Sequence, residues 1–99
     1  MSSKVQVKLR SSRWVRKRSD TDIIASILNE AHMGTRKTRI MYRCNLSHIQ
    51  LKVYLKLLSR MKLLELASEE EGIKPDVLKT TAKGLEFLDA YHKLEVLMT

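Results

Sequence analysis

The chain is poor in the features that mark secreted and membrane proteins. Its single cysteine, Cys44, cannot form an internal disulfide, which favours a reducing, cytoplasmic setting. No stretch approaches the roughly 18 consecutive apolar residues that a membrane-spanning helix needs. The basic N-terminus also lacks the apolar core and cleavage site of a secretory signal. The sequence therefore predicts a cytoplasmic protein with no membrane association.

The residue patterns of catalysis and metal binding are sparse as well. The sequence has no phosphate-cradling glycine loop, no Ser-His-Asp set and no evident pair of catalytic carboxylates. His32, Cys44 and His48 come nearest to a metal site, but they offer only three ligands on different predicted elements. Cys44 is better interpreted as a small buried hydrophobe. We therefore expect no enzyme activity, no metal, no cofactor and no small-molecule ligand.

A third absence concerns charge of one sign. The chain has 19 Lys and Arg against 11 Asp and Glu, a formal net charge of +8, yet no carboxylate occurs between Glu30 and Glu65. A segment that faces phosphates cannot carry carboxylates without like-charge repulsion. The charge pattern favours an acidic partner, nucleic acid first and an anionic membrane surface second.

What is present suits one small domain with a single modest core, since 99 residues are 43% apolar. In "SDTDIIASILNEAHMG", apolar residues recur every three or four positions, which predicts a first helix capped by Ser19 or Asp20 and stopped by Gly34. Thr35 opens a short second helix, "TRKTRIMYRCN", which Asn45 can end. Ser47 is a good N-cap for a third helix that runs to about Met61.

The third predicted helix has two different faces. We expect one to face the core; it carries Leu51, Tyr54, Leu55, Leu58 and Lys62. We expect the other to be basic and exposed; it carries Ile49, Lys52, Val53, Lys56 and Arg60.

The remainder predicts a hairpin and a last helix. "LLELA" (63–67) and "VLKTT" (77–81) are typical of strands, joined by the loop "SEEEGIKPD". Thr81 then caps a helix over about 81–98, whose apolar stripe carries Leu85, Leu88, Tyr91, Leu94 and Leu97 or Met98. Three helices, a β-hairpin wing and a C-terminal helix make a mostly α (α+β) winged helix-turn-helix over residues 19–99, preceded by a flexible or conditionally ordered basic arm, residues 1–18.

Two motifs go beyond this topology, "KTRIMY…NLS" and the "T-x-K-G" sequence that starts the last helix. With the hairpin they span roughly residues 20 to 92 and resemble the archaeal winged-helix regulators labelled ArnR-like, and the small archaeal chromatin-associated winged-helix proteins. The resemblance implies double-stranded DNA binding through the third helix. In the chromatin-associated relatives it also implies dimerisation through the last helix. The wing tip departs from a phosphate-binding wing because it carries Glu69, Glu70 and Glu71, interpreted here as a solvated turn.

This interpretation assigns three sets of DNA contacts. The recognition helix, about 47–61, would enter the major groove with Ser47, His48, Ile49, Lys52, Val53, Lys56 and Arg60. Phosphates would be held near the second helix by Arg36, Lys37, Arg39 and Arg43. The arm would add Arg13, Arg16, Lys17 and Arg18. The simpler alternatives are solvated lysines on the helix and a Trp14 that anchors the arm on its own domain instead of stacking on a base.

We expect a homodimer, since helix-turn-helix proteins commonly bind two half-sites as symmetric pairs. Its contacts would be Leu88, Tyr91, Leu94 and Leu97. The predicted role is a nucleoid-associated transcriptional regulator or chromatin-architectural protein. Two alternatives stay open: an RNA-binding protein that uses the arm, and a protein-interaction module whose contacts include Ile49 and Val53.

Overall fold

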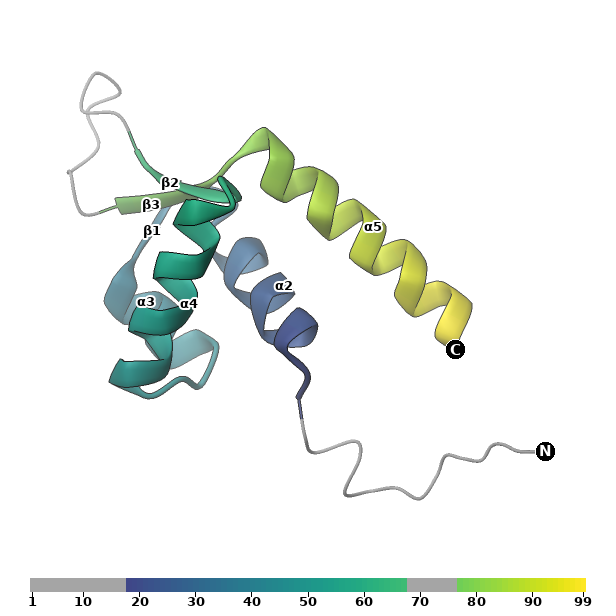
Figure 1. The fold of residues 1–99 in the computed structure, drawn as a ribbon, viewed down its shortest axis with the longest axis horizontal. Helices are drawn as coiled ribbons and strands as arrows, with labels where there is room; N and C mark the ends of the chain where they lie inside the picture. Colours follow the sequence, from purple (N-terminus) through teal and green to yellow (C-terminus); the bar gives the residue numbers. More distant parts are fainter. Residues whose placement is uncertain (1–17, 68–76) are drawn as a thin grey trace.

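The computed structural model describes residues 18–67 and 77–99, and its elements follow the predicted order with one addition. Their bounds are α2 (Asp20–Glu30), β1 (Thr35–Arg36), α3 (Lys37–Arg43), α4 (His48–Arg60), β2 (Leu64–Leu66), β3 (Val77–Thr80) and α5 (Ala82–Met98) (Figure 1). The predicted helices, hairpin strands and final helix are confirmed. The predicted wing tip, with Glu69, Glu70 and Glu71, lies outside the described residues.

The added element is strand β1, and here the sequence prediction was wrong. Thr35 was expected to open the second helix, but Thr35 and Arg36 pair antiparallel with β3, opposite Leu78 and Val77. Gly34 allows this change of direction because its φ is +95°, in the left-handed region. A strand of two residues has no readable alternation, so only its pairing with a segment about 40 residues away defines it.

The other strand pair completes a three-stranded sheet in the order β1-β3-β2. Leu64 lies opposite Thr80 and Leu66 opposite Leu78, so β3 is the central strand. Its side chains at Leu78 and Thr80 are buried, and the sheet therefore contributes one face to the core.

Two helices begin with the same reciprocal cap. The Ser19 hydroxyl accepts from the backbone N–H of Asp22 at 3.1 Å, and the Asp22 carboxylate accepts from the N–H of Ser19 at 3.2 Å. Ser47 and Gln50 make the same pair of bonds at the start of α4. The predictions that Ser47 caps the third helix, and that Ser19 is one of two candidates for the first, are confirmed.

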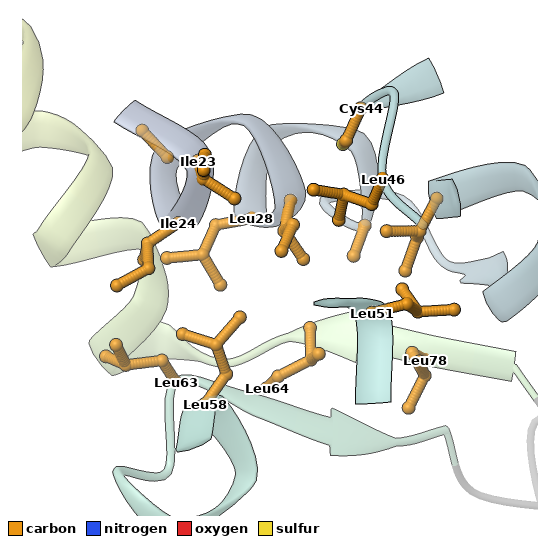
Figure 2. Close-up of a cluster of buried hydrophobic side chains, with 14 of the residues drawn as sticks. Ile23, Ile24, Leu28, Cys44, Leu46, Leu51, Leu58, Leu63, Leu64 and Leu78 are labelled. Carbon is orange, nitrogen blue, oxygen red and sulfur yellow. The ribbon is translucent and has the colours of Figure 1, made fainter. Parts of the chain in front are cut away.

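The core lies between α2 on one side and α4 with the sheet on the other (Figure 2). Its fully buried large side chains are Ile27, Leu28, Ile40, Leu58 and Leu64. Lys62, expected on the core side of the third helix, is instead exposed, because α4 ends at Arg60 and Lys62 adopts a left-handed φ of 62°. Lys62 therefore lies in the turn after α4, and the helical repeat does not determine which way its side chain faces.

Helix α5 packs through a stripe that matches the predicted one only at Leu88 and Tyr91. Gly84 and Leu88 are buried and Phe87 and Tyr91 are partly buried, whereas Leu85 is 39% exposed. Gly84 faces the body, and a Cβ at this position would collide with the Leu63 carbonyl. With Gly84, Phe87, Leu88 and Tyr91 on the side that packs on the body, Leu85 lies outside the contact.

None of the helices within residues 18–67 and 77–99 combines the length and apolar character needed to cross a membrane.

Candidate nucleic-acid interface

The exposed face of α4 is the centre of the candidate interface. Leu51 and Leu58 hold the helix on the body, so the residues opposite them face solvent. Ile49 is 74% exposed and Val53 59% exposed, so two aliphatic side chains lie among the cationic ones on this face. The predicted exposure of this face is confirmed: Ile49, Lys52, Val53, Lys56 and Arg60 are all exposed on α4. His48, directly after the Ser47 cap, is exposed as well.

A hollow of about 350 Å³ lies between α3 and α4, beside this face. Lys37 and Thr38 line it from the start of α3, and His48 and Lys52 from α4. Met41, Leu51 and Leu55 complete the lining. Lys37 and Lys52 thus line the same hollow. Lys37 was predicted to contact phosphate and Lys52 to enter the major groove, so the structure brings one residue of each predicted group together. Thr38 was not among the predicted contact residues, although it lies within the KTRIMY motif.

Two of the predicted phosphate contacts are engaged within the chain. The Nε atoms of Arg39 and Arg43 lie 3.7 and 3.4 Å from the carboxylate oxygens of Glu30, the last residue of α2. Both arginine side chains stay largely exposed, so these are surface ion pairs of modest strength. A phosphate approaching either arginine would compete with Glu30, a contact that the sequence did not reveal.

Arg18 serves the fold itself. Its guanidinium donates to the carbonyl oxygens of Cys44 at 2.7 Å and Asn45 at 3.2 Å. Cys44 is the C-cap of α3, and a cation there satisfies carbonyls that have no partner within the helix and offsets the helix dipole. Arg18 was predicted as a phosphate contact of the arm. The other arm residues of that prediction, Arg13, Arg16 and Lys17, lie outside the described residues, as does Trp14.

The T-x-K-G motif meets the far end of the same α4 helix. The Thr81 hydroxyl donates to the carbonyl oxygen of Lys62 at 2.7 Å and accepts from the N–H of Gly84 at 3.0 Å. The ammonium of Lys83 donates to the carbonyl oxygen of Met61 at 2.9 Å. The motif therefore joins the start of α5 to the C-terminal end of α4.

Two tyrosines attach the first turn of α2 to its neighbours. Tyr54 of α4 donates to the Asp20 carboxylate at 2.7 Å, and Tyr91 of α5 donates to that of Asp22 at 2.5 Å. The bond to Asp22 raises the pKa of Tyr91 to about 12, and the same bond lowers the pKa of Asp22. The bond to Asp20 raises the pKa of Tyr54. The sequence carried no signal for these pairs, whose members lie 34 and 69 residues apart.

Cys44 is buried, as predicted, and burial raises the pKa of its thiol. His32 and His48 are exposed. Within the described part of the chain, His, Cys, Asp and Glu side chains form no group of three or more that can hold a metal ion.

The predicted dimer contacts fall into two groups. Leu88 lies in the core of its own chain and Tyr91 bonds to Asp22, so both are used within the monomer. Leu94 and Leu97 are exposed, the latter at 82%, and Met98 beside them is exposed as well. The C-terminal end of α5 projects past the other helices (Figure 1).

Residues 17–99 match the family model described as winged helix-turn-helix. The chain therefore belongs to the winged helix-turn-helix family, which has a DNA-binding fold. A comparison with curated protein sequences gave no significant match.

Proposed function

We propose that this winged helix-turn-helix protein binds double-stranded DNA with α4 in the major groove. We further propose that it acts as a nucleoid-associated regulator or architectural protein of the ArnR-like or chromatin-associated kind. The observation that carries the proposal is the exposed face of α4, which combines cationic and aliphatic side chains in a segment without carboxylates. Membership of the family supports the DNA-binding fold in general.

The side chains of α4 suit the chemistry of base edges. Lys52 can donate to the O6 and N7 atoms of guanine, and the exposed Ile49 and Val53 can contact thymine methyl groups. The N-terminal turns of a recognition helix meet the bases most directly, and these residues lie in the first two turns of α4. Lys56 and Arg60, further along, are placed for phosphates.

The hollow between α3 and α4 supports the docking geometry. Lys37 and Lys52 line it from two different helices, so one strand of the DNA backbone can meet both charges. Arg39 and Arg43 can join this set by exchanging the Glu30 carboxylate for phosphate.

We also propose a homodimer through the end of α5. Phe87 and Tyr91 pack on the body, and Leu94 and Met98 continue their spacing of four and three residues but are exposed. A second copy that covers this stripe would remove apolar surface from water and give the protein two recognition helices. Leu97 lies at the edge of the stripe.

The test is a fluorescence-anisotropy titration of a labelled random DNA duplex between about 50 and 200 mM salt, beside the corresponding RNA duplex. The double variant Lys52→Gln and Lys56→Gln should weaken DNA binding and reduce the log–log salt slope by up to about 0.9 for each lost phosphate contact. Lys93→Gln removes one positive charge from α5, half the charge removed by the double variant, and measures the effect of net charge per lysine; it should change binding little.

Two outcomes would overturn the proposal. Equal binding of RNA and DNA would point to recognition that does not use the major groove, because A-form RNA does not admit a helix there. Unchanged DNA binding in the double variant would favour the protein-interaction alternative, in which the exposed Ile49 and Val53 contact a protein partner.

A further inference from the structure

Helix α5 is attached to the end of α4 by a compact set of hydrogen bonds. The carbonyls of Met61, Lys62 and Leu63, just after α4, accept from three different groups of α5 and its cap. These donors are the Lys83 ammonium at 2.9 Å, the Thr81 hydroxyl at 2.7 Å and the Thr81 backbone N–H at 3.0 Å. The start of α5 therefore has one position relative to the recognition helix.

A second attachment lies eight residues further along α5, at Tyr91, about 12 Å away along the helix axis at 1.5 Å per residue. Tyr91 donates to Asp22, in the first turn of α2. Asp20 of the same turn accepts from Tyr54 of α4, so this attachment also leads back to the recognition helix. A helix held at two points this far apart is fixed in direction as well as in position.

The exposed apolar stripe begins directly after the second attachment, at Leu94. In the dimer proposed above, this stripe belongs to the contact between copies, whereas Lys83 and Tyr91 connect it to α4 within each copy. Each recognition helix is thus connected to α5 of its own copy by two attachments, and the two copies meet through their α5 helices.

We infer that Lys83 and Tyr91 are positioning residues that hold the two α4 helices of the dimer at a single separation. The DNA it selects would then be a duplex with two half-sites at one fixed spacing, read on successive turns of the helix. This inference rests on the proposed dimer and DNA binding.

The first experiment measures the separation directly. A spin label is placed on Lys56→Cys, exposed on α4, and the distance between the labels of the two copies is measured by double electron–electron resonance. Cys44 is buried in the core and stays in place; mass spectrometry confirms one label per chain. We expect one narrow distance distribution in this protein. Lys83→Met removes one of the three bonds of the first attachment, and Tyr91→Phe removes the second attachment. Adding both changes should widen the distribution at least twofold while the circular dichroism spectrum stays helical.

The matched control carries the same two changes where they break neither attachment. Lys93→Met and Tyr42→Phe alter an exposed lysine of α5 and an exposed tyrosine of α3. This control should keep the narrow distribution. If the double variant unfolds, Lys83→Met and Tyr91→Phe are measured singly, and each should widen the distribution.

The second experiment reads the DNA. With the parent protein, selection from a random duplex library should enrich two copies of a motif at one spacing. With the Lys83→Met and Tyr91→Phe double variant, it should enrich the same motif at several spacings. A dimer whose distance distribution and spacing preference survive both substitutions would overturn the inference alone. Absence of any distance signal between copies, with a monomeric mass in light scattering, would overturn the dimer and the inference with it. DNA binding by anisotropy is scored separately in either case.

Discussion

The hydroxyl of Thr80 donates a 2.6 Å hydrogen bond to the carbonyl oxygen of Leu28, joining the central strand to the last turn of α2. Carbonyls in the last turn of a helix have no partner within the helix. The backbone N–H of Thr80 also donates to the carbonyl of Ala31, at 3.1 Å. Both bonds lie in the protein interior, because Thr80 is buried. Thr80 of β3 thus provides hydrogen-bond donors to two carbonyls at the C-terminal end of α2.

Thr80→Val should destabilise the fold, although valine has the same shape. The substitution leaves the buried carbonyl of Leu28 without a donor, which costs about 1–3 kcal/mol. Urea unfolding followed by circular dichroism measures the change. Thr21→Val, at an exposed position of α2, is the matched control and should shift the free energy of unfolding by less than about 0.5 kcal/mol. Equal stability of the two variants would contradict the role of the Thr80 hydroxyl.

Gly84→Ala should also destabilise the protein, against the usual preference of helices for alanine, which is worth about 1 kcal/mol. The added Cβ would collide with the backbone carbonyl of Leu63, so α5 must shift away from the end of α4. We expect a loss of about 1–3 kcal/mol, typical of overpacking. Ser26→Ala, at an exposed position of α2, tests the helix preference alone and should not destabilise. A more stable Gly84→Ala protein would show that this close approach is not required.

Tyr91→Phe should reduce the free energy of unfolding near neutral pH by about 1 kcal/mol, because the bond to Asp22 is lost. The bond lowers the pKa of Asp22 below 3.8 and raises that of Tyr91 from 10.0 to about 12. Because the pKa of Asp22 is lowered in the folded state, ionised Asp22 stabilises the fold at pH values above the ordinary carboxyl pKa. This stabilisation is lost as pH falls below about 4. Because the pKa of Tyr91 is raised in the folded state, protonated Tyr91 stabilises the fold fully below pH 10. This stabilisation is lost as pH rises towards 12.

The stability difference between parent and Tyr91→Phe should therefore be largest between about pH 4 and 10 and shrink on both sides. Denaturant titrations across this range measure it. Tyr42→Phe, at an exposed position, should show no such profile. A difference that stays constant down to pH 2 would mean that the Asp22 bond does not depend on its ionised form.

Glu30→Gln should raise DNA affinity by freeing Arg39 and Arg43 from their ion pairs. If both arginines then reach phosphates, the salt slope steepens by up to about 0.9 for each new contact. The loss of surface pairs should cost less than about 1 kcal/mol of stability. Glu86→Gln, an exposed carboxylate of α5, controls for net charge. The same gain in affinity from both variants would show that overall charge, not release of the arginines, is responsible.

Much of the architecture could be predicted because its signals are local. The Ser47 cap and its partner Gln50 are three residues apart, and the left-handed Asn45 ends α3 by its own conformational preference. The two faces of α4 follow from the helical repeat, so the exposure of Ile49, Lys52 and Val53 was predictable from spacing alone. The carboxylate-free segment from 31 to 64 could likewise be seen without coordinates.

Tertiary structure decided what depends on partners far away in the chain. Strand β1 exists because β3 lies beside it, and Leu85 lies outside the contact because α5 packs on the body through the side that carries Gly84 and Leu88. The same holds for the candidate interface. Arg43 pairs with Glu30, 13 residues earlier, and Arg18 donates to the carbonyl of Cys44 at the C-terminal end of α3. A sequence determines which residues share a helix face, because that is set by covalent spacing. Which group occupies the space opposite them is set by packing, and only the folded chain brings those atoms together.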